Sequence, residues 1–386
     1  MRRTTDHILT MHAGSLPRPD DVRAMVLGKG EGESVDEELL ATRLQEAVTG
    51  VVQMQIECGV DSINDGEQSK TNFSNYVKER LGGTIIRTYE PGGGPEPQQI
   101  SGRDRQEFPY YFSSGRSQGG TRPRNKQTFC VEPLTYVGQD QLAADMARFK
   151  NALTNVTEQE PFLPAVAPGS VEHWLWNEHY TTQEEFVYAI ADVMHQEYKA
   201  IAEAGFVLQI DDPDMFDAFQ IHPGFDVPEY RKFAQLRIEA LNYALRDIPR
   251  EQVRLHVCWG SYHGPHLYDI PLKDVIDLFL TVNASAYSIE ASNPAHDHEW
   301  VEWKNVKLPD GATLIPGVVG HSSDFIEHPE LVAQRLLRYA DIVGKENLMA
   351  GTDCGLGTRV GDPAIAWAKF RSMSQGAAIA SAKLWG

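Results

Sequence analysis

The residues in this sequence best suited to chemistry are a histidine and a cysteine separated by a single position. His256 and Cys258 lie in the apolar run 255–259. Residues i and i+2 of a β-strand project to the same face, so the two side chains are predicted to point together. One imidazole and one thiolate make half of a tetrahedral zinc site. The alternative is that both side chains belong to an ordinary strand core.

Two later apolar segments end in further candidate ligands. The run 285–290 ends in Glu290, and the run 347–354 ends in Cys354. If the segments are parallel strands of one barrel, their carboxyl ends open at the same mouth, where active sites lie. Two thiolates favour zinc over magnesium or calcium. The alternative reading makes Cys354 a small buried hydrophobic residue and Glu290 a salt-bridge partner. The predicted zinc ligands are His256, Cys258, Glu290 and Cys354.

These residues belong to a regular alternation of short apolar segments and longer helical patterns. Eight strands alternating with helices predict an α/β fold, a (β/α)8 TIM-like barrel. An open doubly wound sheet has no support, because no glycine-rich strand-to-helix turn of dinucleotide-binding form is present. The predicted strands are 11–16, 60–65, 161–167, 206–211, 253–258, 285–290, 313–318 and 347–352. The predicted helices are 35–58, 183–204, 228–246, 272–281, 329–342 and 362–382.

The region 82–128 interrupts this alternation after the second strand. It is polar and rich in glycine, and such a composition fits a long excursion over the barrel better than a core element. We interpret it as an insertion within a single barrel domain, residues 1–386, that is either a lid or a packed surface loop. It could also be a contact in a homo-oligomer. Its arginines could receive an anionic ligand: Arg103, Arg105, Arg116, Arg122 and Arg124.

Composition limits the classes of partner. The 386 residues carry 35 Lys and Arg against 54 Asp and Glu, a formal net charge of −19, which disfavours nucleic acid and anionic membranes. Hydrophobic residues make up 41% of the chain, which is enough for a large core. Neither a signal peptide nor an apolar run of about 18 residues is visible. Four cysteines do not make a disulfide framework in a chain of this length. We therefore expect a cytoplasmic protein.

Taken together, the motifs resemble cobalamin-independent methionine synthase, specifically its C-terminal catalytic half. The resemblance covers nearly the whole chain, and the segments follow one another in the family's order. It implies a zinc ion that binds a thiol substrate, most readily homocysteine, so that the thiolate can attack a methyl or alkyl donor. The donor would be a folate, a corrinoid protein or a small methylated compound. The matching segments are 14–17, 65–67, 209–213, 256–258, 288–290, 316–318 with 321–322, and 353–356 with Thr358 and Arg359.

The resemblance also assigns roles to residues outside the predicted metal site. It implies that Ser15 with Gly14, Glu67 and Asp211 hold the amino acid portion of homocysteine. Two carboxylates suit an ammonium group, and the backbone and hydroxyl at 14–15 suit a carboxylate. Without the resemblance, Asp211 would read as a residue that caps a loop at the end of a strand.

Four further residues are predicted to act around the methyl donor or the metal. His321 matches the family histidine that lies beside the donor and could protonate a leaving nitrogen. Asp353 could orient the metal site or merely hydrogen-bond at a strand end. Trp174 and Trp176 follow the third strand and offer a flat surface for an aromatic donor, although core packing explains them nearly as well. His263, His266, His296 and His298 lie in what reads as polar loops at the barrel mouth.

Other functions remain open at this level. The chain corresponds to only one of the two halves of the complete synthase, so the grip on a folate must differ. Related enzymes transfer an epoxide-derived alkyl group to coenzyme M, but a sulfonate thiol would prefer arginines to the carboxylates at Glu67, Asp211 and Glu290. A non-catalytic zinc-binding barrel would normally close its site with four Cys or His ligands. A zinc hydrolase would prefer ligation that is richer in histidine.

Overall fold

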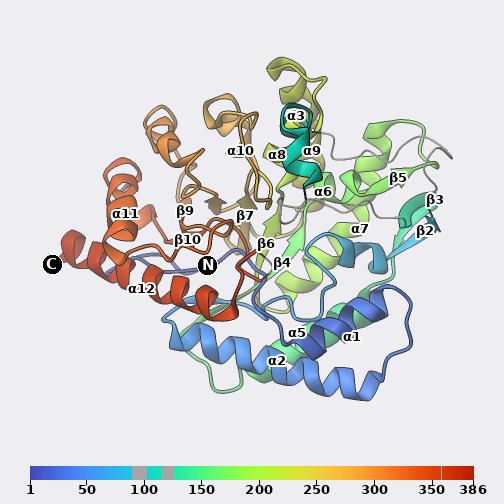
Figure 1. Ribbon diagram of the computed structural model, residues 1–386, viewed down its shortest axis with the longest axis horizontal. Helices are drawn as coiled ribbons and strands as arrows, with labels where there is room; N and C mark the ends of the chain where they lie inside the picture. Colours follow the sequence, from blue (N-terminus) through green and yellow to red (C-terminus); the bar gives the residue numbers. More distant parts are fainter. Residues whose placement is uncertain (89–101, 115–125, 358) are drawn as a thin grey trace.

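The computed structural model describes residues 1–88, 102–114, 126–357 and 359–386. Its centre is a parallel sheet that curls into a barrel, with helices packed around it (Figure 1). This confirms the predicted α/β, TIM-like fold. Neighbouring strands pair in the order β1-β4-β6-β7-β8-β9-β10. The strands are β1 Ser62–Ile63, β4 Glu160–Val166, β6 Val207–Asp211, β7 Val253–Val257, β8 Ala286–Ile289, β9 Thr313–Val319 and β10 Gly351–Thr352.

A short segment near the N-terminus joins the two edge strands of this sheet. Met11 N donates to the carbonyl oxygen of Ala350 at 2.9 Å, and Ser62 N donates to that of Thr10 at 2.9 Å. Parallel bridges therefore connect residues 10–11 to both sides, so that eight segments surround the barrel axis. The predicted strand 11–16 is wrong in extent. Pairing stops after Met11, and Gly14 has a positive φ of 147° that turns the chain out of the sheet.

The helices follow the sequence pattern because their starts carry capping residues and one face of each is apolar. The Thr182 side chain accepts from Glu185 N while the Glu185 carboxylate binds the Thr182 backbone, which fixes the start of α7. The predicted helix 272–281 is instead a 3-10 turn, Leu272–Asp274, followed by one short helix. The helices outside the insertion are α1 Asp20–Gly30, α2 Glu37–Glu57, α5 Gln139–Ala152, α6 Pro168–His173, α7 Gln183–Glu203, α8 Asp214–Ile221, α9 Val227–Ala244, α10 Ile276–Phe279, α11 Pro329–Val343 and α12 Pro363–Trp385.

The predicted insertion 82–128 begins and ends in a second sheet, seen at the right of Figure 1. In this sheet β2 (Leu81–Thr88) pairs antiparallel with β3 (Lys126–Tyr136), and β3 pairs parallel with β5 (Leu175–Asn177). Its base is tied to the barrel through Arg80, whose buried guanidinium pairs with Glu197 of α7 at 3.1 Å. Segments 89–101 and 115–125, with Arg116, Arg122 and Arg124, lie outside the described residues.

The described middle of the insertion, residues 102–114, packs on a loop at the barrel mouth. It contains the short helices α3 (Arg103–Glu107) and α4 (Pro109–Ser113). Asp104 is fully buried, and its carboxylate accepts from Tyr262 Oη at 2.8 Å and from Leu267 N at 3.2 Å. Arg103 donates to the carbonyl oxygen of Phe219, so this arginine is engaged with the barrel. This part of the insertion is therefore a docked surface element.

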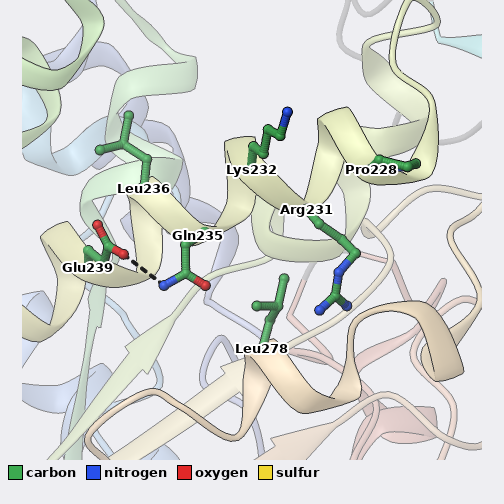
Figure 2. Close-up of a pocket in the computed structure, with 7 residues that line it drawn as sticks. All are labelled: Pro228, Arg231, Lys232, Gln235, Leu236, Glu239 and Leu278. Carbon is green, nitrogen blue, oxygen red and sulfur yellow. Dashed lines mark hydrogen bonds between the residues drawn. The ribbon is translucent and has the colours of Figure 1, made fainter.

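One surface depression lies away from the barrel mouth. It has a volume of about 610 Å³ and lies on the outer helical layer, along α9 and beside Leu278 of α10 (Figure 2). Its walls are mainly the side chains of one exposed helix face, with Gln235 donating to Glu239 at 2.8 Å. The depression therefore offers no cluster of catalytic groups. Within the described ranges, no helix combines the length and apolarity needed to cross a membrane.

Candidate active site

The structure brings three of the four predicted zinc ligands together. His256 is on β7, Cys258 directly follows β7, and Cys354 follows β10. One ligand atom from each lies within 4.8 Å of the other two. Because these strands are parallel, their carboxyl ends open on the same side of the barrel, as expected for an active-site mouth. A nitrogen and two sulfur atoms in this arrangement form a donor set suited to zinc.

The imidazole of His256 is held as a metal ligand would be. Its Nδ1 lies 3.1 Å from Ser288 Oγ on the neighbouring strand β8, which orients the ring. Its Nε2 is buried and has no hydrogen-bond partner within the described part of the chain. Burial lowers the pKa of His256, but contact with Cys354 and the charges of Asp211 and Glu290 outweigh burial and leave the pKa raised. The free Nε2 beside two thiols is the observation that fits a metal best.

The two thiols form a pair with unequal acidity. A hydrogen bond from Cys258 holds the pKa of Cys354 well below its ordinary value, and the same contact raises the pKa of Cys258. Ser261 Oγ also donates to Cys354 Sγ at 2.9 Å. Arg359 lies close enough for its guanidinium to feel the charge of both sulfur atoms. Of the two thiols, Cys354 is therefore the more easily ionised.

Glu290, the fourth predicted ligand, falls into a neighbouring group. Its carboxylate oxygens accept from Trp259 N and from Asn293 Nδ2, each at 2.9 Å. Together with His321 and Asp353 it forms a second group of ligand atoms that lie within 4.8 Å of one another. Its charge still reaches the first group, because it raises the pKa values of His256 and Cys258. Glu290 thus belongs to the group of His321 and Asp353, and its charge acts on the thiol group as well.

Asp353 and His321 differ in how they are bonded. Asp353 accepts from Ala291 N at 2.8 Å and from Ser292 N at 2.9 Å, so it fixes the turn that follows β8. Burial raises its pKa to about 6. His321 follows β9 and is only 1% exposed, and neither ring nitrogen has a partner among the described residues. Asp353 therefore shapes the site, whereas His321 is free to act on a ligand.

The predicted amino acid site contains two buried carboxyl groups. Burial, followed by the charge of neighbouring carboxylates, raises the pKa of Glu67 to about 7, and the positive charge of Lys70 counteracts this only in part. Burial likewise raises the pKa of Asp211 to about 6, although Gln209 Nε2 donates to it at 2.8 Å. The charge of Asp211 helps to raise the pKa of Glu67, and the charge of Cys354 helps to raise the pKa of Asp211, so both carboxyl groups belong to this end of the barrel.

Gly14 and Ser15 complete this part of the site. A Cβ on Gly14 would lie 2.4 Å from Glu67 Oε1, and a Cβ on Gly355 would lie 2.3 Å from Ser15 Oγ. Segment 14–15 therefore packs between the Glu67 carboxylate and the residue that follows Cys354. Glu67 itself has a positive φ of 55°, an uncommon conformation for a residue with a side chain. Such strain is typical of a functional position.

The two predicted tryptophans have different surroundings. Trp174 ends α6, contacts the His173 ring at 4.5 Å between centroids, and has a buried Nε1 without a partner in the described structure. Trp176 lies in β5 of the second sheet and packs on Phe129 of β3, with centroids 5.8 Å apart. Trp174 therefore keeps a free donor, whereas the contacts of Trp176 are those of a sheet residue. Thr358 lies outside the described residues.

Several residues of the site carry no signal that sequence reasoning used. Lys70, which faces Glu67 and donates to the carbonyl oxygen of Pro164 at 2.7 Å, stands three residues after Glu67. Ser288 stands two positions before Glu290. It lies in segment 288–290, which resembles the family, but the resemblance gives Ser288 no role. Ser261 lies in a loop. In each case the role depends on a neighbour distant in sequence, which spacing alone does not reveal.

Comparison with known proteins gives a consistent result. Residues 124–378 match the family described as the catalytic domain of cobalamin-independent synthase. Methionine synthase from Thermococcus kodakarensis is 24% identical over 372 residues, which cover 96% of this chain and 93% of that protein. The 5-methyltetrahydropteroyltriglutamate–homocysteine methyltransferase of Thermotoga petrophila is also 24% identical, but this chain covers only 41% of its length.

Solved structures support the same assignment at the level of the fold. A B12-independent methionine synthase from Shewanella sp. W3-18-1, in complex with selenomethionine, superposes with a TM-score of 0.71 at 20% identity and covers 98% of this chain and 99% of its own. A putative vitamin-B12 independent methionine synthase from Listeria monocytogenes gives a TM-score of 0.67 at 17% identity, with 98% and 99% covered. The residues that match the family, 124–378, span most of the barrel strands and the part of the candidate site from Asp211 to Cys354. This chain belongs to the family of cobalamin-independent synthase catalytic domains.

Proposed function

We propose that this protein is a methyltransferase that transfers a methyl group to the thiol sulfur of homocysteine and that it depends on one zinc ion. The observation that carries the proposal is the group of His256, Cys258 and Cys354, in which a buried imidazole nitrogen, without a hydrogen-bond partner among the described residues, faces two thiols. Relatives named methionine synthase and homocysteine methyltransferase support the choice of acceptor.

The residues present fit a zinc ion. His256 Nε2, Cys258 and Cys354 would supply one nitrogen and two sulfur ligands, and Glu290 would supply an oxygen from the adjoining group. Zinc, when bound, favours the deprotonated form of a thiol ligand and so supplies a good sulfur nucleophile at neutral pH. Ser288 orients His256 through Nδ1, and Asp353 holds the turn next to Glu290. These contacts preorganise the ligands before the substrate arrives.

The buried carboxyl groups would bind the ammonium group of the amino thiol. Glu67 and Asp211 are buried, and their raised pKa values indicate that they lack full charge compensation. An ammonium group placed between them would compensate both charges and lower both pKa values. The Ser15 hydroxyl, beside Gly355, would donate to the substrate carboxylate. This arrangement selects an amino acid thiol over a sulfonate thiol.

His321 would handle the proton of the methyl donor. Neither ring nitrogen has a partner in the described ranges, and the ring is buried next to Glu290 and Asp353, so it can hold a proton toward the donor without competition from solvent. We propose that it protonates the atom that loses the methyl group. Replacing His321 with Asn should therefore leave zinc and homocysteine binding intact while slowing methyl transfer.

Three classes of methyl donor are compatible with the proposal: a methylated folate, a corrinoid protein and a small methylated compound. Trp174, whose indole N–H has no partner in the part of the chain that the structure describes, is the candidate surface for an aromatic donor. Trp176 is a weaker candidate because it packs within the second sheet. Turnover with each donor class, measured at the same concentration of zinc and homocysteine, assigns the donor.

The first test is zinc-edge X-ray absorption on the reduced, zinc-loaded protein with and without homocysteine. The expected spectrum without substrate contains two sulfur and two lighter ligands. Homocysteine should add one sulfur neighbour and remove one light atom. Methionine added in place of homocysteine serves as a control without a free thiol. A zinc shell that stays unchanged with homocysteine would contradict the proposed acceptor.

A further inference from the structure

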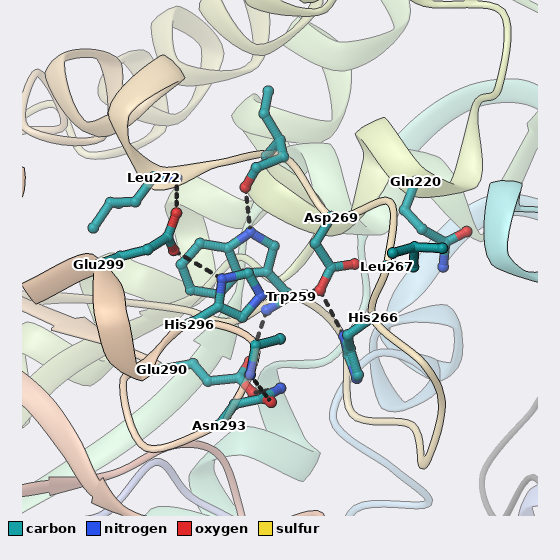
Figure 3. A network of polar contacts seen from close by, with 12 residues as sticks. Gln220, Trp259, His266, Leu267, Asp269, Leu272, Glu290, Asn293, His296 and Glu299 are labelled. Carbon is teal, nitrogen blue, oxygen red and sulfur yellow. Dashed lines mark hydrogen bonds and ion pairs between the residues drawn. The ribbon is translucent and has the colours of Figure 1, made fainter.

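A further group of ionisable side chains, distinct from the two groups described above, lies close to Glu290 (Figure 3). It consists of His266, Asp269, His296 and Glu299, and each of these side chains is less than a tenth exposed. Three of them have ligand atoms within 4.8 Å of one another, as in the thiol group. By proximity alone, this would be a second candidate metal site.

The hydrogen bonds of the two histidines argue against metal binding. His266 Nδ1 lies 2.6 Å from Asp269 Oδ2, and its Nε2 lies 3.2 Å from the carbonyl oxygen of Tyr262. His296 Nε2 lies 3.0 Å from Asp269 Oδ2, and its Nδ1 lies 2.8 Å from Glu299 Oε2. All four ring nitrogens therefore face oxygen acceptors. A neutral imidazole has only one N–H, so each ring must carry two and be an imidazolium ion.

The charges within the group agree with this protonation state. Two imidazolium ions balance the carboxylates of Asp269 and Glu299. Burial lowers the pKa of each histidine, but hydrogen bonds to Asp269 outweigh it and raise both values to about 9. Burial raises the pKa of Asp269, but the N–H groups of His266 and His296 hold it below its ordinary value. The charges of Glu290 and Asp217 also face His266.

A short series of contacts connects this group to Glu290. The His296 ring stacks on the Trp259 indole with centroids 3.7 Å apart and an angle of 12° between the planes. Trp259 Nε1 donates to the carbonyl oxygen of Ile270 at 2.8 Å, and Trp259 N donates to Glu290 Oε2 at 2.9 Å. A cation over an indole face is attractive. The position of the Trp259 backbone, and so its bond to Glu290, therefore depends on the His296 cation.

The insertion contacts the same group from the other side. Tyr262 stacks on His266 with centroids 4.3 Å apart, and its hydroxyl donates to Asp104 of α3 at 2.8 Å. Gln220 Nε2 also donates to the Tyr262 hydroxyl at 3.2 Å. Residue 104 of the insertion is thus connected through Tyr262, His266, Asp269 and His296 to Trp259.

We propose that His266 and His296 are buried imidazolium ions that, with Asp269 and Glu299, position Trp259 and thereby hold Glu290 beside the zinc ligands. They are positioning residues, because they reach the metal site only through Trp259. The positioning role rests on the proposed function, since it requires zinc to bind next to Glu290. The protonation state of the two rings does not depend on zinc.

The protonation state can be measured on the unaltered protein. In protein labelled with 15N only in histidine, the ring nitrogen shifts of two histidines should be those of imidazolium at pH 7.5, in both metal-free and zinc-loaded samples. His298→Gln, a change at an exposed position, should retain both imidazolium signals, whereas His296→Gln should lose one of them. A wild-type spectrum without any persistent imidazolium pair at this pH would overturn the ionic assignment.

The positioning role can be measured by zinc affinity, without reference to turnover. Competition with a chromophoric chelator should show that zinc binds His296→Gln about tenfold or more weakly than wild type, which is the range for partners that orient metal ligands. His298→Gln should stay within twofold of wild type. Circular dichroism identifies a variant that does not fold, in which case the 15N measurement on wild type still decides the ionic assignment.

The outcomes separate this inference from the proposed function. Unchanged zinc affinity in a folded His296→Gln would overturn the positioning role while leaving the zinc site in place. Wild-type protein that binds no zinc would overturn both the zinc site and the positioning role. In that case an imidazolium pair in the 15N spectrum would still establish the ionic group, so the two failures are distinguishable.

Discussion

Two groups of side chains in this barrel look alike by distance and differ in their bonding. In both the thiol group, His256 with Cys258 and Cys354, and the ionic group around Asp269, ligand atoms lie within 4.8 Å of one another. In the thiol group a buried imidazole nitrogen has no partner in the described structure. In the ionic group every ring nitrogen faces an oxygen acceptor.

This difference shows that proximity does not define a metal site. A ligand atom must have a free lone pair, and in the ionic group each ring nitrogen of the histidines carries a proton that it donates to an oxygen acceptor. What remains there is a neutral set of charges that stabilises the loops at the barrel mouth. The thiol group keeps an unused nitrogen and an easily ionised sulfur, which are the properties that a metal requires.

The largest expected effect comes from breaking the ionic group. Asp269→Asn leaves two buried imidazolium ions with one carboxylate, and loss of one partner of a buried ion pair typically costs about 3–5 kcal/mol. We expect the free energy of unfolding to fall by that amount in urea titrations, while zinc supplied in excess still binds. Asp274→Asn, at a partly exposed position, should change stability by less than about 0.5 kcal/mol. If Asp269→Asn lost zinc binding while its free energy of unfolding stayed unchanged, the ionic group would be the metal site instead of a stabilising group.

The complementary change is Cys354→Ser in the thiol group. Zinc sites of about four ligands contribute roughly 10–16 kcal/mol, so losing one thiolate should cost about 3–4 kcal/mol of binding, or roughly 100- to 1000-fold in affinity. The metal-free protein should unfold at nearly the same urea concentration as wild type. Chelator competition measures the affinity, and Cys58→Ser, which alters another buried thiol, is the control. Full zinc occupancy in Cys354→Ser under competition would remove it from the ligand set.

Glu67 tests whether the substrate end of the site stores unfavourable charge. Its pKa is about 7 in the folded protein against an ordinary value of 4.5, so the folded state binds more protons than the unfolded state between these pH values. Stability is therefore lost as pH rises through this window. Metal-free Glu67→Gln should gain about 2–3 kcal/mol relative to wild type between pH 4.5 and pH 8, measured by urea unfolding. Parallel pH profiles for the two proteins would contradict this.

The smallest expected effect concerns the orientation of His256. Ser288→Ala removes the hydroxyl that contacts Nδ1, and loss of such a partner typically lowers metal affinity about 10- to 100-fold. Ser285→Ala, at the position just before the same strand, should leave affinity unchanged. Equal affinities for the two variants would mean that packing alone orients His256.

Most of the barrel could be predicted because its strands are continuous apolar runs. β4, β6, β7, β8 and β9 lie within one residue of the predicted segments, since strands buried on both faces read as uninterrupted apolar sequence. The strand predicted at 11–16 is too long, because Gly14, Ser15 and Leu16 continue the apolar run in sequence but form a loop at the barrel mouth. Hydrophobicity predicts burial, and a buried functional loop resembles a strand in this respect.

The site was predictable where two residues share one strand face and not where a side chain has a competing partner. Cys258 follows His256 by two positions, so their common direction follows from strand geometry. Glu290 also ends a strand, but Trp259 N and Asn293 Nδ2 donate to its oxygens, and its ligand atoms lie in the group of His321 and Asp353. His296 and Asp269 are 27 positions apart. Sequence reasoning placed the histidines in a polar loop, because their pairing is visible only in three dimensions.

The closure of the barrel by residues 10–11 also has a consequence in time. Thr10 is synthesised long before Ala350, the residue that flanks it on one side of the barrel. At about 5–20 residues per second, the first segment waits roughly 17 to 70 s for that neighbour. Until residue 350 has been synthesised, the growing sheet has an open edge that this neighbour has not yet covered. A ribosome that stalls before residue 350 therefore carries a sheet that cannot close.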